Sequence, residues 1–396
     1  MTTHQPSPTS LTPIVLAIDT SCDETSVAIT CGLEIWSNIV ASQIELHKPY
    51  GGVFPTVAKQ AHLENILPTI KQALKRAKVD WQDIDQMMVT VGPGLAPALE
   101  VGIETAKKLA KQYNKPLMPA NHINGHIWSG LALRPKKNSQ SLAMASRKMQ
   151  ANQRSKQVLS KIKWPILSLV VSGGHTLLVQ IAHQGQLKSF DQSSNNENFG
   201  EQNKAYKTSA QLLDRQPNLA VDSSNIILGQ SIDDAAGEAL DKIGRMLNLG
   251  YPAGPVVEIL AKTGDPHSYI WPLPMTESRD LNLSFSGIKT YARNFLEQNW
   301  HGQPLSRNEL ADFCASLQYA VFRHICYKLN KFLQNNTAPI SYLWLGGGVA
   351  ANLTLRKMLR QTLKPFNIKL QTPYSKNLCG DNAAMIGVSL VETLSQ

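Results

Sequence analysis

The order of apolar and polar residues divides the chain into short strands and amphipathic helices. Apolar residues fill 14–18 and 27–29, and the polar stretch 19–25 lies between them, which predicts a β-hairpin with a polar tip. The apolar spacing beyond this hairpin predicts a helix, a strand and, after a Gly/Pro turn, a second helix at Gln60–Ala77, Met87–Val91 and Gly102–Tyr113. Strands therefore alternate with helices.

The same pattern begins again at two later points. The apolar run ILSLVV, from Ile166, leads into Ser172-Gly173-Gly174, and SYLWL, from Ser341, leads into Gly346-Gly347-Gly348. Two similar α/β lobes would explain this recurrence and the length of 396 residues, with the cleft between them as the expected site. We expect an N-terminal lobe, a C-terminal lobe and a final loop with a helix at 14–164, 165–376 and 377–396.

Two segments interrupt the alternation and are interpreted as insertions. Residues 131–164 contain nine Lys or Arg residues and no Asp or Glu, so they form either a basic arm that contacts RNA phosphates or a solvated face. Residues 184–229 are rich in Gln, Asn and Ser, a composition typical of a solvated surface helix or a partly mobile loop.

The composition, 42% apolar and 17% charged, is that of a soluble globular protein. The formal net charge of +10 attracts polyanions, so nucleic acid is one interpretation of the partner, although many basic proteins bind none. The five cysteines form no CxxC pair, which favours a reducing compartment. The sequence shows neither a secretory signal nor an apolar run of about 18 residues, so we expect a cytoplasmic protein with no membrane segment.

A histidine pair is the first candidate for chemistry. His122 and His126 lie four residues apart, which on a helix places both imidazoles on one face, as a divalent metal requires. The alternative is two polar or half-buried histidines without a metal. A zinc peptidase is excluded, because Ile123 stands where the HExxH motif has its catalytic glutamate.

Two glycine-rich turns follow apolar strands. Ser172-Gly173-Gly174-His175 either lets backbone N–H groups approach phosphate or carboxylate oxygens or is an ordinary tight turn. Gly346–Asn352 either opens a helix beneath a flat ligand such as adenine, with Asn352 offering its amide, or ends in a helix cap.

Two acidic segments accompany apolar helices. Asp233 and Asp234 are candidate helix caps, and Asp241, further along the same segment, could reach a ribose hydroxyl if its helix borders the cleft. Asp381 precedes the apolar segment Ala383–Leu390, where it is either an N-cap or a hard oxygen ligand.

Nine spaced segments are distinctive together: AIDTSCDETSVAI at 17–29, HKPYGGVFP at 47–55, VGPGLAPALEVG at 91–102, NHINGH at 121–126, VVSGGHT at 170–176, DDAAGEALDKIGRMLNLGYPAGP at 233–255, LSFSGIKT at 283–290, GGGVAAN at 346–352 and CGDNAAMIG at 379–387. In this order they resemble the tRNA N6-adenosine threonylcarbamoyltransferase family, formerly described as O-sialoglycoprotein endopeptidases, within the actin/Hsp70/sugar-kinase ATPase superfamily. The resemblance spans nearly the whole chain.

The resemblance implies an α/β fold of two actin-like, ribonuclease H-like lobes with a central interlobe cleft. It implies that His122, His126 and Asp381 bind one divalent metal ion per subunit, with Fe²⁺ favoured and Zn²⁺ as the alternative. Asp23 and Glu24 would form part of the catalytic edge. The pocket for threonylcarbamoyl-adenylate would comprise Val170, Val171, Ser172, Gly173, Gly174, Asp241, Gly254 and Asn352.

The implied reaction transfers the threonylcarbamoyl group from threonylcarbamoyl-AMP to N6 of adenosine 37 in tRNAs that read codons beginning with A. The family works with a synthase that supplies the adenylate and, in bacteria, with a same-fold paralogous subunit and a small ATPase. The alternatives are a superfamily ATPase or small-molecule kinase, which would need no histidine pair opposite Asp381, and a scaffold subunit, whose degenerate relatives lack that pair.

The chain departs from the family pattern at three positions. Thr56 stands where Glu is common, Ala253 where a second Gly is common, and Gly380 where Thr is common. All three presumed metal ligands are retained.

Overall fold

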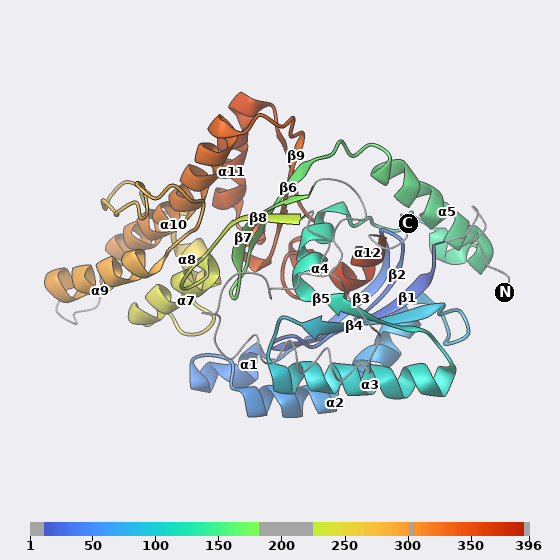
Figure 1. Ribbon diagram of the computed structural model, residues 1–396. Coiled ribbons are helices and arrows are strands. Elements are labelled where there is room, and N and C mark those ends of the chain that lie inside the picture. The colour runs from blue at the N-terminus through green and yellow to red at the C-terminus, as the bar shows by residue number, and fades with distance from the viewer. Residues whose placement is uncertain (1–11, 182–224, 301–304, 392–396) are drawn as a thin grey trace.

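Each lobe is built on a five-stranded mixed sheet, and the two sheets have the same strand order and directions (Figure 1). The computed structural model describes residues 12–181, 225–300 and 305–391. In spatial order the strands of the first sheet are β3 (Glu34–Ser42), β2 (Glu24–Cys31), β1 (Ile14–Asp19), β4 (Gln86–Gly92) and β5 (Leu117–Asn121). Those of the second are β10 (Lys369–Gln371), β9 (Tyr342–Gly346), β6 (Ile166–Val171), β7 (Thr176–Ile181) and β8 (Asn225–Gln230).

The correspondence between the sheets extends to every strand pair. In the first sheet β1–β2 and β2–β3 are antiparallel, whereas β1–β4 and β4–β5 are parallel. In the second sheet β6–β7 and β7–β8 are antiparallel, whereas β6–β9 and β9–β10 are parallel. The prediction of two similar α/β lobes is therefore confirmed.

Helices cover both sheets. In the N-terminal half they are α1 (Ile44–His47), α2 (Pro55–Ala77), α3 (Ala96–Tyr113), α4 (His122–Trp128) and α5 (Met144–Leu159). In the C-terminal half they are α7 (Ala236–Met246), α8 (Gly254–Leu260), α9 (Ser286–Trp300), α10 (Arg307–Asn335), α11 (Leu353–Leu363) and α12 (Ala383–Ser389). Figure 1 shows α2 and α3 side by side beneath the first sheet. No helix in the described ranges is both long and apolar enough to cross a membrane.

Most elements predicted from the apolar pattern are confirmed, with shifts at their ends. The hairpin of β1 and β2 has its polar tip at 20–23. Helix α2 begins at Pro55, five residues before the predicted start, because proline is well suited to the first turn of a helix. Helix α3 begins at Ala96 instead of Gly102, with a proline again in its first turn.

Strand β1 reads as a continuous apolar run because both of its faces are covered. Ile14, Leu16 and Ile18 face a core formed with α2 and α3, whereas Val15 and Ala17 face a second core that includes α4 and α12. Helix α12 follows the last strand of the second sheet but packs against β1, β2 and α4. The end of the chain thus returns to the first lobe.

The basic insertion 131–164 forms α5, which lies against the first sheet at the end where β1 starts (Figure 1). Arg147 is buried with its guanidinium 3.7 Å from the centre of the Trp36 ring, and Lys148 pairs with Asp85 at 2.7 Å. Arg154 pairs with the buried Glu34. Five lysines of the insertion are exposed, at 136, 137, 156, 161 and 163. The insertion is therefore partly a packed helix and partly a solvated basic face.

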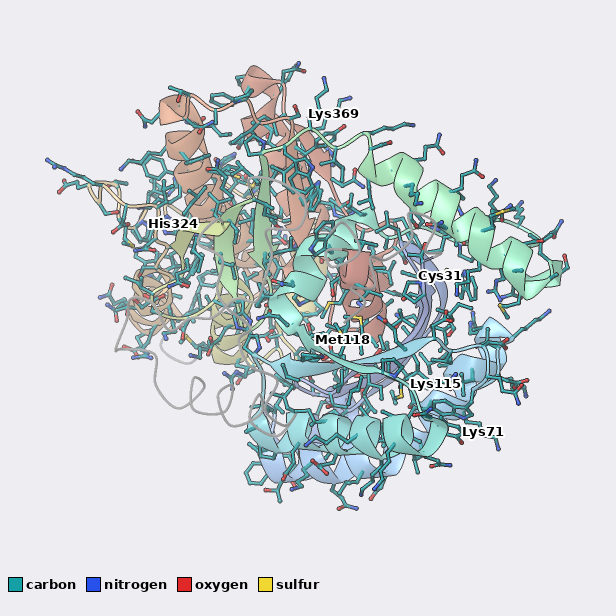
Figure 2. The ribbon with its side chains drawn as sticks, turned by 45° about the vertical axis from the view of Figure 1, so that its right-hand side comes forward. Cys31, Lys71, Lys115, Met118, His324 and Lys369 are labelled. Atoms are coloured by element: carbon teal, nitrogen blue, oxygen red, sulfur yellow. The ribbon has the colours of Figure 1, made fainter. Side chains whose placement is uncertain are left out.

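Positive charge is not confined to that insertion. Lys71 on α2 and Lys369 on β10 lie on well-separated parts of the surface (Figure 2). The polar insertion predicted at 184–229 lies outside the described residues except for its last five positions, which belong to β8.

Candidate metal centre and substrate cleft

A cleft of about 580 Å³ opens between the two lobes, where the carboxyl ends of their strands meet. Its walls include the turn after β1, the turn after β6 and the start of α4. Open α/β sheets place ligands at this edge because the loops that follow parallel strands converge there. The predicted site residues that line it are Asp23, Glu24, His122, Ser172, Gly173, Gly174, Asp241 and Asp381.

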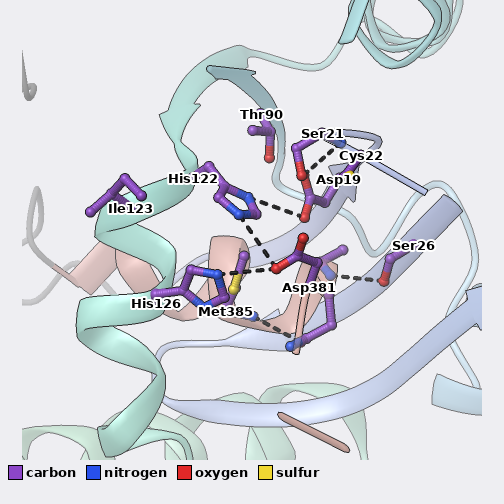
Figure 3. Close-up of polar contacts among 12 residues, drawn as sticks. Asp19, Ser21, Cys22, Ser26, Thr90, His122, Ile123, His126, Asp381 and Met385 are labelled. Carbon is purple, nitrogen blue, oxygen red and sulfur yellow. Dashed lines mark hydrogen bonds and ion pairs between the residues drawn. The ribbon is translucent and has the colours of Figure 1, made fainter. Parts of the chain in front are cut away.

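The structure brings His122, His126 and Asp381 together at one end of this cleft (Figure 3). Nε2 of His126 lies 3.1 Å from Oδ1 of Asp381, and Nε2 of His122 lies 3.5 Å from the same oxygen. The imidazoles stand edge to face with their centroids 4.7 Å apart. The ligand atoms of His122, His126 and Asp381 all lie within 4.8 Å of one another. Within the described residues, these three side chains could therefore hold a metal ion.

A second carboxylate borders the pair. Asp19, at the end of β1, is 1% exposed, and its Oδ2 lies 3.6 Å from Nδ1 of His122. Burial alone would lower the pKa of His122, but the charges of Asp381 and Asp19 outweigh it and raise that pKa to about 10. Burial opposes ionisation of Asp381, yet the two imidazoles hold its pKa well below the usual range. The centre is therefore rich in negative charge and favours a cation.

The donor set fits a divalent metal. Two imidazole nitrogens and one carboxylate oxygen suit Fe²⁺ or Zn²⁺, and three protein ligands leave coordination positions for a substrate. In the described structure the buried Nδ1 atoms of His122 and His126 have no hydrogen-bond partner, and both Nε2 atoms face the carboxylate. The two Nε2 atoms thus converge on one carboxylate oxygen, as the ligands of a shared cation would.

Close packing of α4 and α12 brings Asp381 to the histidines. A Cβ on Gly125, between the two histidines, would lie 2.9 Å from Cδ1 of Ile386, and one on Gly387 would lie 2.5 Å from Oγ1 of Thr30. Glycine at both positions lets α12 approach the first lobe closely. The N–H of Ala383 also donates to Oγ of Ser26, which fixes the start of α12 on β2.

The alternative role for Asp381, as a helix N-cap, is excluded. The N-cap of α12 is Asn382, whose side-chain oxygen accepts the Met385 N–H at 3.2 Å. Asp381 is therefore free to point at the histidines (Figure 3).

The turn between β1 and β2 presents Asp23 and Glu24 to the cleft. Burial raises the pKa of Glu24 well above its usual value, and the nearby charges of Asp23 and Asp381 add to that effect. This wall of the cleft can therefore carry a proton as well as negative charge.

The turn between β6 and β7 is both a tight turn and a wall of the cleft. Ser172 N–H donates to the His175 carbonyl at 2.8 Å, and His175 N–H donates to Oγ of Ser172 at 3.0 Å. A Cβ on Gly173 or Gly174 would meet no atom within 4 Å. Internal packing therefore does not require glycine there, and the open space beside the backbone is available to a ligand.

Of the remaining predicted pocket residues, only Asp241 lines the cleft. Asp241 borders the cleft from α7, and its Oδ1 accepts the N–H of Gly254. Val170 and Val171 are buried in β6. Asn352 is 5% exposed and caps α11, while its NH₂ group donates to Oε1 of Gln318 at 2.6 Å. Gly254, both valines and Asn352 do not line the described cleft, so their contact with a substrate stays a prediction.

Of the three departures from the family pattern, only Gly380 borders the cleft. A Cβ there would meet no atom within 4 Å. Thr56 is exposed in the first turn of α2, and Ala253 is buried before α8. The change at 380 therefore leaves additional space beside Asp381.

Sequence reasoning missed several residues that border the centre. Asp19 was indicated only by its place at the end of an apolar strand, and nothing in its spacing pointed to His122. His175, Tyr251 and Arg245 line the cleft from the second lobe. Their contribution depends on how the lobes face each other, which local spacing does not encode.

Solved structures with this fold include two of HypF. One, from T. kodakarensis, is 14% identical, matches 98% of this chain and 48% of its own, and has a TM-score of 0.50. The other, full-length HypF in the phosphate- and nucleotide-bound form, is 12% identical, matches 97% of this chain and 47% of its own, and has a TM-score of 0.51. At these identities the likeness concerns the fold alone, and the fold is the expected pair of actin-like lobes.

Sequence comparison is more specific. The family model of tRNA N6-adenosine threonylcarbamoyltransferase matches residues 34–151 and 218–388. The enzyme of that name from Gloeothece citriformis is 36% identical over 96% of this chain and 91% of its own length, and that from Symbiobacterium thermophilum is 36% identical over 95% and 90%. The chain therefore belongs to the tRNA N6-adenosine threonylcarbamoyltransferase family, and it is a transferase.

Proposed function

We propose that this protein transfers the threonylcarbamoyl group of threonylcarbamoyl-AMP to N6 of adenosine 37 in tRNAs that read codons beginning with A, and releases AMP. The observation that carries the proposal is the meeting of His122, His126 and Asp381 at one end of a cleft whose other walls are an acidic turn and a glycine turn. A superfamily kinase would have no use for that histidine pair.

The walls of the cleft complement the parts of such a donor. Within the described residues the N–H groups of Gly173 and Gly174 have no hydrogen-bond partner, so they can bind the phosphate oxygens of the adenylate. Asp241, on α7, can accept a hydrogen bond from a ribose hydroxyl with the carboxylate oxygen not used by Gly254. The donor would thus span the second lobe with its acyl end toward the histidines.

The reaction is an acyl transfer. The N6 amine attacks the carbamoyl carbon, a C–N bond forms, and the bond from that carbon to the phosphate oxygen breaks with its electron pair leaving on AMP. N6 also loses a proton, for which Asp23 and Glu24 are the carboxylates on the neighbouring turn. A divalent metal held by His122, His126 and Asp381, with Fe²⁺ favoured and Zn²⁺ as the alternative, would polarise the carbamoyl oxygen.

The proposal includes protein partners and a cytoplasmic location. A same-fold paralogous subunit and a small ATPase are the partners that the family resemblance implies. Support for a protein partner comes from apolar side chains that are about half exposed on α1, α2 and the segment between them, namely Leu46, Tyr50, Phe54, Leu63 and Leu67. Tyr50 and Phe54 stack at a centroid distance of 5.1 Å.

One reconstitution tests the proposal. Purified protein is given threonylcarbamoyl-AMP and an ANN-decoding tRNA, with and without the two partner proteins, and modified adenosine is measured by nucleoside mass spectrometry. Asp381→Ala is expected to lose metal and to lower the rate about a thousandfold or more, because the remaining pair of histidines lacks its anionic ligand. The exposed Asp265→Ala serves as the control. Wild-type turnover by metal-free Asp381→Ala would contradict the proposed centre.

A further inference from the structure

The turn that carries Asp23 and Glu24 is held by three consecutive carbonyl groups. The Ser21 carbonyl accepts the Leu95 N–H at 2.8 Å, and the Asp23 carbonyl accepts the Gln43 N–H at 2.9 Å. The Cys22 carbonyl, between them, faces Nε2 of His62 at 3.0 Å. Two of these anchors are backbone groups, so His62 is the anchor that the amino-acid sequence itself can change.

The hydrogen bonds fix the protonation of His62. A carbonyl oxygen only accepts, so Nε2 must carry the proton that it donates to Cys22. Nδ1 is then an acceptor, and it lies 2.8 Å from Oγ1 of Thr25, whose hydroxyl donates to it. Burial lowers the pKa of His62, which favours this neutral form. The ring thus connects the residues on either side of Asp23 and Glu24.

The ring is enclosed by packed elements. His62 and Thr25 are both fully buried, and α2, which carries His62, packs closely on β2, which begins at Glu24. Any buried imidazole needs partners for its ring nitrogens, and here both partners, Cys22 and Thr25, flank the two carboxylates. Because Asp23 and Glu24 lie between those residues, a shift of the ring would disturb the backbone on both sides of the two carboxylates.

We propose that His62 is a positioning residue that holds the Asp23–Glu24 turn in its place at the cleft. This inference rests on the proposed function, because it assumes that the two carboxylates act in the transfer. His62 touches no substrate itself. Its contribution is to keep the acidic turn at a fixed distance from the reacting atoms, where small displacements have large effects on rate.

Two amide substitutions at position 62 test whether the hydrogen bond to Cys22, and not merely a polar side chain, holds the turn. In His62→Gln the terminal NH₂ can take the place of Nε2 and donate to the Cys22 carbonyl. In His62→Asn the side chain is one methylene shorter and keeps only the Thr25 contact. Cys22 provides a direct reporter of the turn, because it is partly exposed whereas Cys31, Cys314, Cys326 and Cys379 are buried. Its rate of alkylation rises if the turn becomes mobile.

The expected result is that His62→Asn labels faster at Cys22 and loses about tenfold or more in kcat, with the KM for threonylcarbamoyl-AMP and the metal content unchanged. His62→Gln is expected to restore both the labelling rate and kcat. His324→Asn, at another fully buried histidine in the second lobe, controls for the loss of a buried ring and should leave Cys22 labelling at the wild-type rate.

Two outcomes would overturn the inference: wild-type labelling of Cys22 in His62→Asn, or faster labelling with wild-type kcat. Labelling needs no substrate, so it also separates this inference from the proposed function. If the wild-type protein fails to modify tRNA, the proposed function fails, while the alkylation rates still decide whether His62 holds the turn.

Discussion

The β1–β2 turn and the β6–β7 turn occupy equivalent places in two sheets of the same topology, but their chemistry is different. The first is acidic, with Asp19, Asp23 and Glu24, and the second is Ser172-Gly173-Gly174-His175. The repeated fold thus determines where a turn meets the cleft, and the local sequence determines what that turn can bind. A fold by itself does not specify a reaction.

The two turns also differ in how they are held. The acidic turn is anchored through its carbonyl groups by three different elements, so its side chains have defined positions. The glycine turn is closed by its own Ser172 and His175, and its two glycines line the cleft with no hydrogen-bond partner for their N–H groups in the described residues. One wall therefore places carboxylates, and the other offers backbone donors to an anion.

Among changes that test the difference between the two turns, removing a charge from the acidic turn is expected to have the largest effect. Asp23→Asn should lower kcat by about a hundredfold or more, because general acid–base groups typically contribute that much, while donor KM and metal content remain unchanged. Single-turnover kinetics and elemental analysis measure these quantities. The exposed Glu45→Gln on α1 is the matched control. An unchanged kcat would show that Asp23 takes no part in the reaction.

Making the glycine turn acidic would remove the difference between the walls. Gly174→Asp should raise the KM for threonylcarbamoyl-AMP by about tenfold or more through charge repulsion, with a smaller change in kcat. Gly287→Asp is the control, since Gly287 is also exposed with no atom within 4 Å of an added Cβ. A donor KM that stays at the wild-type value would show that the phosphate does not lie beside this turn.

The smallest effect is expected at the end of the first lobe opposite the cleft. Neutralising Lys156, Lys161 and Lys163 to alanine should weaken tRNA binding by about threefold or less, because α5 lies where β1 starts and the cleft lies where it ends. The measurement is the salt dependence of Kd. An unchanged slope would show that these lysines do not contact the RNA. A large loss of tRNA affinity would show that the RNA reaches both ends of the lobe.

Local sequence predicted the elements well, and the resemblance supplied most of the candidate site. The hairpin, the strand–helix alternation and the restart at Ile166 follow from apolar periodicity, which reports burial within one element. Spacing placed His122 and His126 on one face of α4. It could not join them to Asp381, because that contact depends on the packing of α12 on the first lobe.

The assignments that sequence left open were decided by particular contacts. Asn382, not Asp381, caps α12. Asn352 caps α11, and its contact with a substrate stays a prediction. The basic insertion proved to be a helix with Arg147 buried against Trp36, which charge counting could not distinguish from a solvated arm. No sequence pattern indicated His62, because a single histidine in an amphipathic helix forms no motif and its partner is a carbonyl group forty residues away.

The return of α12 to the first lobe also sets an order of events during synthesis of the protein. His126 and Asp381 are 255 positions apart, so at roughly 5–20 residues per second the ribosome needs about 13–50 s to travel from one to the other. Throughout that time the nascent first lobe has its two histidines but lacks Ala383, Met385 and Ile386, which complete one of its cores. The three side chains of the candidate metal centre therefore come together only after both lobes have been translated.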